Sequence, residues 1–485
     1  MTSSSTAPAK PSGFESLLQV ADRLREGTTS ARELAEIVLS NAERAQRRCN
    51  AFLAIDAAGL FAQAERADLL LNELRRRGAA VGMAHAFSPL LGIPLAHKDM
   101  FDRAGVASRY GSRVRADHVA IRSAPVIARL EAAGASCVGA LNMAEFAVGA
   151  TGHNAAYGDC RNAWDPAFIA GGSSSGSGAA VACGAAYASL GSDTGGSVRI
   201  PAAVNGLVGL KPTYGLIPRT GSMKLSPSID VIGPIARETA DLAEVLAIVA
   251  GGDGVDANAS MRPVADYRAA VGRGVEGLRI GIPRNYFFDC TTTEVRAAME
   301  RSVDLLVEAG AIRVAIDVPD AAEMAELSRA IVYAEATALH GPWLRQRGEQ
   351  YTAQVRLRAS TGLGIPAAAY IEALRLRLPL LERFVKAVFA RCDVLHTPTL
   401  PIPVPRRDET DVGSGAALWT ILSRLVHCTA PFNYLGLPAI TVPAGLDARG
   451  LPLAAQYVAR PFDEVRLLRV AAAQQRAWPL PAIRF

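Results

Sequence analysis

The sequence predicts an α/β protein whose mixed, largely parallel central sheet is covered by helices on both faces. Amphipathic helical stretches alternate with short apolar runs along most of the 485 residues, and this alternation is typical of layered α/β folds. Half of the residues are hydrophobic and a fifth are charged, which is the composition of a globular protein with a substantial core.

The first elements of the chain are helical. Residues 1–13 are small and polar without an apolar segment, so we expect a disordered tail there. Phe14 to Glu26 then shows a helical pattern, and Ser30 with Glu33 forms a capping box that starts a second helix. The apolar run 51–55 predicts a strand, and another helix follows it.

The rest of the chain repeats this alternation. Strands are expected over apolar runs at 92–96, 136–141, 188–191, 278–282, 314–318, 394–396, 439–442 and 455–458. Helices are expected between them, for example at 125–133, 178–186, 293–309 and 366–391. Since no linker rich in Pro, Gly or Ser divides residues 14–485, we expect one domain, in which 255–375 is a candidate for a semi-independent lobe.

Charge and cysteine usage exclude several classes of function. The 51 basic and 46 acidic residues give a formal net charge of +5 without a dominant basic run, so no nucleic-acid partner is expected. Seven scattered cysteines and seven histidines lack metal-ligand spacing, which argues against a metal site or disulfide framework and for a reducing, cytoplasmic compartment. No uninterrupted apolar run reaches the roughly 18 residues of a membrane span.

Two loops stand out as chemical. Residues 171–178 read GGSSSGSG, and such small residues allow close approach of backbone to ligand. The helix expected after this loop would point its N-terminal amides at a developing anion. In the second loop, Gly195 and Gly196 precede Ser197, which is the arrangement of an oxyanion hole beside a nucleophile.

A base is still needed, because a serine hydroxyl is a weak nucleophile by itself. Lys98 follows the predicted strand 92–96, and burial at that strand end would lower its pKa until the neutral amine could act as a general base. None of the seven histidines lies in a comparable setting. The residues alone therefore favour a lysine-activated serine.

Taken together, these motifs resemble the amidase-signature family over nearly the whole chain. The matching pieces, in order, are GIP to KD at 92–99, GGSSSGSG at 171–178, GSDTGGSVR at 191–199, GLKPT at 209–213, and GLP to RPF at 450–462. The spacing from Lys98 to Ser173 and from Ser173 to Ser197 is also similar to that of the family. The resemblance implies the amidase-signature fold.

The resemblance implies a role for each matching residue. Ser197 stands at the acylated nucleophile, and Ser173, after a peptide bond that is commonly cis, would relay protons between Ser197 and Lys98. The family holds the tetrahedral oxyanion on backbone amides, which here belong to Thr194, Gly195, Gly196 and Ser197. Water would release the acid, and no metal or organic cofactor is required.

Several further matches are weaker. The resemblance implies supporting hydrogen bonds from residues beside the two loops, namely Asp193, Arg199 and Ser174. It also implies a substrate-lining loop at Gly149, Ala150 and Thr151. Ser175 departs from the usual glycine, which would be costly if the position needed a positive φ. Other pocket walls are expected from Met100, Phe101, the segment 320–375 and Trp419.

The predicted function is hydrolysis of a carboxylic amide C–N bond through a serine acyl-enzyme, giving an acid and an amine or ammonia. The substrate is a small amide of open identity, and the family suggests a homodimer. The first rival function is that of the glutaminase component of a tRNA-dependent amidotransferase, which works in a complex. Its glutamine-binding arginine could be Arg358, but the position of its aspartate falls near Val426.

Two short motifs suggest further functions. GSSSG at 172–176 matches the G-x-S-x-G elbow of α/β-hydrolase esterases with Ser174 as nucleophile, but it follows a loop where that motif follows a strand. A nucleotide-binding module would need a lysine after Gly176, where Ser177 stands, and the G-x-G-x-x-G at 272–277 precedes its strand, which is the wrong order.

Overall fold

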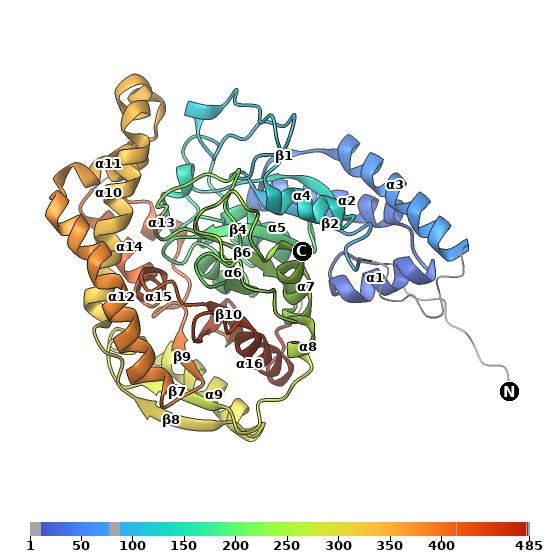
Figure 1. The fold of residues 1–485 in the computed structure, drawn as a ribbon. Helices are drawn as coiled ribbons and strands as arrows, with labels where there is room; N and C mark the ends of the chain where they lie inside the picture. The colour runs from blue at the N-terminus through green and yellow to red at the C-terminus, as the bar shows by residue number, and fades with distance from the viewer. Residues whose placement is uncertain (1–10, 77–87, 414, 482, 484–485) are drawn as a thin grey trace.

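The computed structural model describes residues 11–76, 88–413, 415–481 and 483. Most of the tail expected at 1–13 therefore lies outside the described residues. The chain forms a mixed α/β structure with one large and one small sheet (Figure 1), so the predicted α/β class with helices around a mixed sheet is confirmed. None of the helices in the described ranges is long and apolar enough to cross a membrane.

The large sheet has eight strands. Their order across the sheet is β4 (Ala188–Asp193), β6 (Val231–Ala236), β5 (Val208–Lys211), β10 (Ala439–Leu446), β11 (Pro452–Val458), β9 (Val394–Pro398), β7 (Arg279–Pro283) and β8 (Ile312–Ile316). The small sheet has the order β1 (Phe52–Ile55), β3 (Ser136–Leu141) and β2 (Pro94–Lys98).

The expectation of a largely parallel sheet is wrong. In the large sheet only β7 pairs in parallel with its neighbours β8 and β9, and all other neighbours are antiparallel. Two central strands, β5 and β6, carry no strong sequence signal, since β5 is short and β6 contains Gly233 and Pro234, which are disfavoured in strands. Because the sequence pattern does not reveal β5 and β6, the remaining alternation of helices and strands predicted parallel crossovers.

The helices cover the sheets on both faces. They are α1 (Leu17–Glu26), α2 (Ala31–Cys49), α3 (Ala57–Arg76), α4 (Pro125–Ala132), α5 (Ser175–Ala182), α6 (Arg199–Val204), α7 (Thr239–Val249), α8 (Arg268–Val271), α9 (Thr293–Glu308), α10 (Ala321–Arg347), α11 (Ala353–Ser360), α12 (Ala367–Phe389), α13 (Arg407–Thr410), α14 (Ala417–Val426), α15 (Ala430–Tyr434) and α16 (Glu464–Ala477). The predicted capping box of Ser30 and Glu33 starts α2.

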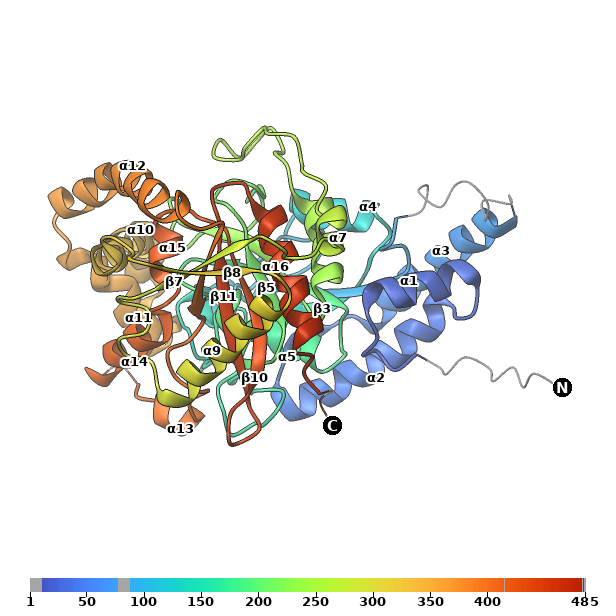
Figure 2. The same ribbon diagram turned by 90° about the horizontal axis from the view of Figure 1, so that it is seen from below.

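The helices also divide the molecule into regions. Helices α9 and α16 lie side by side over the middle strands of the large sheet (Figure 2). The short α6 also packs against β5, β10 and β11. The long helices α10 and α12 gather at one side of the molecule, and α1 to α3 at the opposite side (Figure 1). The loops after β2 and β4 meet between these regions, where the candidate site lies.

The two sheets are joined where those loops begin. All five residues of β2 are buried, and the His97 side chain accepts the backbone N–H of Leu190 on β4 at 3.3 Å. This contact fixes the end of β2, with Lys98, beside the end of β4. Residues that are 94 positions apart in sequence are thereby brought together at one site.

Candidate active site

Lys98 is the buried centre of the site. It is only 1% exposed, and its Nζ lies at hydrogen-bond distance from two hydroxyls, 2.7 Å from the Ser173 Oγ and 2.9 Å from the Ser192 Oγ. The predicted pairing of Lys98 with Ser173 is therefore present in the structure. Ser192 was not predicted, and it gives the amine a second fixed partner.

The environment of Lys98 favours the neutral amine. Burial lowers its pKa from the ordinary 10.5 to about 7, although the carboxylates of Asp230 and Asp193 oppose this shift. Desolvation penalises the charged form of a lysine, whereas a nearby anion stabilises it. The balance leaves an amine that can take up and return a proton near neutral pH.

The loop before α5 is packed too tightly for larger residues. The Gly172–Ser173 peptide bond is cis, as the resemblance implied, and a Cβ on Gly172 would lie 2.8 Å from the carbonyl oxygen of Gly149. Ser173 is fully buried against Lys98. Small residues at this loop therefore allow a serine hydroxyl to reach the buried amine.

Ser174 and Ser175 have structural positions. Ser174 is fully buried, and its Oγ donates to the Ser192 carbonyl oxygen at 3.4 Å, so it braces the loop and does not face the cavity. An esterase nucleophile at Ser174 is therefore not supported. Ser175 is the first residue of α5 and is not among the residues with positive φ. The serine in place of glycine causes no backbone strain there.

The Ser197 loop is held by a buried ion pair. Both side chains of the pair Asp193 and Arg199 are fully buried, and the Arg199 Nε and Nη2 donate to the Asp193 carboxylate at 3.0 and 2.8 Å. Arg199 also donates to Asn433 and Gln456, each at 2.6 Å. The Arg199 guanidinium and other partners hold the pKa of Asp193 below its ordinary value, although burial alone would raise it.

The Asp193 carboxylate also accepts a hydrogen bond from one of the backbone amides that were expected to form the oxyanion hole. Its carboxylate accepts the backbone N–H of Gly196 at 2.8 Å and that of Val198 at 3.2 Å. The Gly196 amide is thus engaged inside the loop. Of the four amides predicted for the oxyanion hole, that of Gly196 is therefore bonded to Asp193. The other three belong to residues that line the cavity, namely Thr194, Gly195 and Ser197, and their role stays a prediction.

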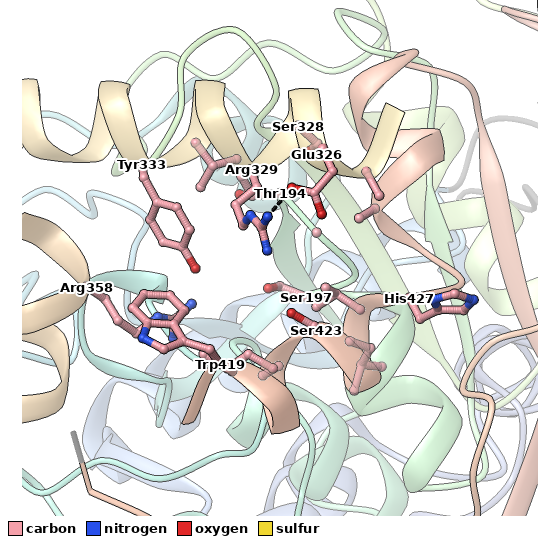
Figure 3. A pocket seen from close by; sticks show the side chains of 18 of the residues that line it. Thr194, Ser197, Glu326, Ser328, Arg329, Tyr333, Arg358, Trp419, Ser423 and His427 are labelled. Carbon is pink, nitrogen blue, oxygen red and sulfur yellow. Dashed lines mark hydrogen bonds and ion pairs between the residues drawn. The ribbon is translucent and has the colours of Figure 1, made fainter. Parts of the chain in front are cut away.

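A cavity of about 340 Å³ opens over Ser197. The predicted substrate loop contributes Gly149 and Ala150 to its wall, whereas Thr151 is not part of the lining. Figure 3 shows Ser197 between side chains of α10 on one side and of α14 on the other. The cavity volume is sufficient for a small organic substrate.

The cavity walls come mainly from α10 and α14. The α10 wall consists of Ala322, Ala325, Glu326, Ser328, Arg329, Val332 and Tyr333. Tyr333 meets Trp419 of α14 edge to face, with ring centroids 5.5 Å apart. The segment 320–375 and Trp419 line the cavity as predicted, but the buried Met100 and Phe101 do not.

Some charged side chains that line the cavity form ion pairs, and others do not. Glu326 and Arg329 form an ion pair on successive turns of α10 (Figure 3). Arg358 of α11 also lines the cavity, and its Nε and Nη1 are buried without a hydrogen-bond partner in the described part of the chain. An unpartnered buried cation is costly, and a guanidinium matches a carboxylate in charge and shape. Arg358 is therefore a candidate anchor for an anionic substrate.

Sequence reasoning missed several residues of the site. Ser192 contacts Lys98, Asp230 contacts Thr194 of the Ser197 loop, and Tyr286 and His427 stack with ring centroids 4.2 Å apart beside the cavity. Ser192 could have been noticed because it directly precedes Asp193 in the motif at 191–199. The other three come from distant segments, and no local motif marks them. Within the described residues, no three His, Cys, Asp or Glu side chains are grouped to hold a metal ion.

Comparison with known proteins agrees with this fold. The family model for amidases matches residues 33–468, and the chain belongs to the amidase family, whose signature enzymes share the Ser-Ser-Lys arrangement. A Roseiflexus sp. (strain RS-1) relative, the A subunit of glutamyl-tRNA(Gln) amidotransferase, is 38% identical over 483 residues, which cover 95% of this chain and 96% of that relative.

Solved structures show the same fold. One, from work on a vestigial protein complex and the evolutionary origins of an s-triazine catabolic enzyme, has a TM-score of 0.87 at 31% identity, covering 97% of this chain and 100% of that one. A peptide amidase in complex with the competitive inhibitor chymostatin has a TM-score of 0.82 at 27% identity, covering 97% and 99%.

Proposed function

We propose that this protein hydrolyses the C–N bond of a small carboxylic amide through an acyl-enzyme on Ser197. The observation that carries this proposal is the 2.7 Å contact between the buried Lys98 amine and the Ser173 hydroxyl, next to a cavity that Ser197 lines. A nucleophile at the cavity with a buried base behind it is the arrangement that covalent amide hydrolysis requires.

In the acylation step the Ser197 Oγ forms a bond to the amide carbonyl carbon. Its proton passes to the Ser173 Oγ, while the Ser173 proton passes to the Lys98 Nζ. The resulting oxyanion is held by the amides of the Ser197 loop, which are fixed before the substrate arrives because Asp193 braces that loop. Fixed donors of this kind stabilise the transition state without reorganisation.

The proton then returns along the same route. Lys98 gives a proton back through Ser173 to the leaving nitrogen, the C–N bond breaks, and the amine or ammonia departs. A water molecule attacks the Ser197 ester, losing its proton into the same relay, and the acid leaves with Ser197 regenerated. Each half-reaction thus uses Lys98 once as base and once as acid.

We further propose that the substrate carries a carboxylate that Arg358 binds. The buried Nε and Nη1 of Arg358 have no partner in the described residues, whereas Arg329 is already paired with Glu326. Val426 contributes an apolar surface at the position where a glutamine site would need a carboxylate for the α-ammonium group. The free charge of the cavity is therefore positive, which favours a monoanionic amide.

The second candidate is the glutaminase component of a tRNA-dependent amidotransferase. The 38% identity to such a protein along nearly both full chains favours it. In that function the protein would release ammonia from glutamine and act with partner proteins. Arg358 would bind the α-carboxylate of glutamine, but the cavity would have to leave the ammonium group without a dedicated carboxylate.

The two candidates differ in their preference between glutaramate and glutamine. These amides share the same carboxylate and the same scissile bond, and only glutamine carries an α-ammonium group. We expect glutaramate to have the higher kcat/KM and Arg358→Met to lose this activity while still cleaving an uncharged amide such as butyramide. A preference for glutamine, or growth rescue of an amidotransferase-deficient strain, would favour the second candidate.

A further inference from the structure

We propose that Asp230 is a positioning residue of the active site, which holds the Thr194 end of the nucleophile loop through a buried hydrogen bond. This proposal rests on the proposed function, since it assigns a role in the same reaction at Ser197. Asp230 lies before β6, 33 residues after Ser197, and no motif of the sequence links the two. The structure brings its side chain to the loop.

Both oxygens of the Asp230 carboxylate accept hydrogen bonds from fixed donors. Its Oδ1 accepts the Thr194 hydroxyl at 2.7 Å, and its Oδ2 accepts the backbone N–H groups of Leu225 and Ser226 at 2.8 and 2.9 Å. Asp230 is 5% exposed. Hydrogen bonds to an ionised acceptor are among the stronger ones in proteins, so the Thr194 side chain has one defined orientation.

The position of Thr194 explains why this orientation matters. Thr194 directly precedes Gly195, and both residues line the cavity beside Ser197. On the other side of the same loop, Asp193 and Arg199 hold the backbone. Asp230 thus holds the Thr194 side chain, whereas Asp193 holds the backbone amides of Gly196 and Val198. Amides of an oxyanion hole must be aligned closely, since small misplacements reduce the rate strongly.

Asp230 also contributes to the electrostatics of the base. Its charge raises the pKa of Lys98 against the larger effect of burial, as does that of Asp193. The groups that face Asp230 are the Thr194 hydroxyl, the two backbone amides, Lys98 and Arg219, whose Nη1 donates to the Asp230 carbonyl oxygen at 3.3 Å. Loss of the Asp230 charge should therefore lower the pKa of Lys98.

The segment that carries Asp230 is itself fastened to the cavity wall. The Ser226 Oγ donates to the Glu335 carboxylate at 2.6 Å, and the Ser228 N–H donates to it at 3.1 Å. Glu335 belongs to α10, the same helix that supplies the Glu326–Arg329 face of the cavity. A chain of hydrogen bonds thus connects α10, the segment 225–230 and the nucleophile loop that carries Thr194 and Ser197, with Asp230 at its centre.

The test uses a fluorophosphonate probe, because its reaction with Ser197 needs the relay but no knowledge of the natural substrate. The rate of labelling is measured from pH 5.5 to 9 for the wild type and for Asp230→Asn, Thr194→Val and their combination. Asp241→Asn is the matched control: Asp241 is also buried and accepts two backbone amides, those of Leu17 and Leu18, without contact to the nucleophile loop.

We expect both single variants to label roughly 10- to 100-fold more slowly than the wild type. The double variant should be little slower than either, because both changes break one hydrogen bond. In Asp230→Asn the rise of the rate with pH should also move to lower pH, since Lys98 loses a stabilising anion. Thr194→Val removes the hydrogen bond that opposes the effect of burial on Asp230, and burial already raises the pKa of Asp230 to about 6. Only Asp241→Asn should therefore keep the wild-type pH dependence.

Two results would overturn the proposal. One is an Asp230→Asn protein that labels at the wild-type rate with the wild-type pH dependence. If Asp230→Asn does not fold, Thr194→Val takes its place in the test. A folded Thr194→Val protein that is labelled at the wild-type rate would show that the hydrogen bond between Thr194 and Asp230 has no role in positioning. A wild-type protein that is not labelled at Ser197 would instead contradict the proposed function itself, so the two failures are distinguishable.

Discussion

Lys98, the last residue of β2, and Ser192, the penultimate residue of β4, lie in two different sheets and meet through a 2.9 Å hydrogen bond. A neutral amine has two N–H groups and one lone pair. If one N–H is directed to Ser192, rotation of the amine about its carbon–nitrogen bond is limited, and the lone pair can be presented to the Ser173 hydroxyl 2.7 Å away. Ser192 thus orients the base at the junction of the sheets.

Ser192→Ala should lower kcat roughly tenfold with little change in KM, because the amine loses an orienting partner while the cavity keeps its shape. The measurement is steady-state kinetics on the best amide of a panel. Ser189→Ala is the matched control on the same strand, since the buried Ser189 Oγ contacts only the Leu190 carbonyl in the described residues. An equal loss in both variants would indicate a general weakening of β4.

The pH dependence of kcat/KM should report the Lys98 pKa. The relay needs the neutral amine, and the pKa of Lys98 lies at about 7. Activity should therefore be low where the amine is protonated and should rise as the pH increases through about 7. The measurement is kcat/KM from pH 5 to 9 on an uncharged amide, and a rate independent of pH across this range would contradict a lysine base.

The nucleophile can be identified by intact-protein mass after exposure to a fluorophosphonate. We expect one adduct, which maps to Ser197 and is absent from Ser197→Ala. Lys98→Met should react much more slowly, since the triad acts as a unit. Ser174→Ala should still form the adduct because Ser174 is buried away from the cavity; an adduct on Ser174 would restore the esterase hypothesis.

Val426→Asp should shift the substrate preference toward glutamine. The new carboxylate would lie in the same cavity as Arg358 and could pair with the α-ammonium group that the natural cavity does not bind. The ratio of kcat/KM for glutamine to that for glutaramate should rise roughly tenfold, as one good charge pair would give. Val426→Asn is the uncharged control, and an unchanged ratio in Val426→Asp would place the α-substituent elsewhere.

Arg199→Met should destabilise the fold by about 3–5 kcal/mol, because Asp193 would remain as a buried charge without its partner. Urea unfolding followed by circular dichroism measures this change. Arg284→Met is the control, since the Arg284–Asp317 pair is exposed to solvent and exposed pairs contribute little. If both variants unfold at the same urea concentration, the buried pair is not essential to stability.

The sequence predicted most of the elements but not the direction of the strands. Strong periodic stretches such as α4 and β3 lie where expected, because their apolar pattern decides burial locally. The expected helix at 178–186 begins earlier, at Ser175, because glycine and serine have low helix propensity and concealed its first turn. Strand direction depends on pairing between distant segments, which no local pattern records.

In the candidate site, too, the sequence predicted the residues that a local motif marks and missed those that only the fold brings together. Lys98, Ser173 and Ser197 could be named because short motifs surround them. Residues such as Asp230 and Tyr286 reach the site through contacts across the fold, and their neighbours in sequence carry no related signal. The predicted set of oxyanion-binding amides included Gly196 for a similar reason. The motif GGS does not record whether the Gly196 amide points to the substrate or to Asp193, and in the structure it donates to Asp193.

The buried Arg199 has a consequence for the synthesis of this protein. A growing chain contains all three residues of the proposed triad once Ser197 has been added. The loop that carries Ser197 is braced through Arg199 by Asn433 and Gln456, which follow Arg199 by 234 and 257 residues. A nascent polypeptide therefore holds the complete set of reactive groups long before it has the means to align them, and hydrolytic competence arises only after these two residues have been translated.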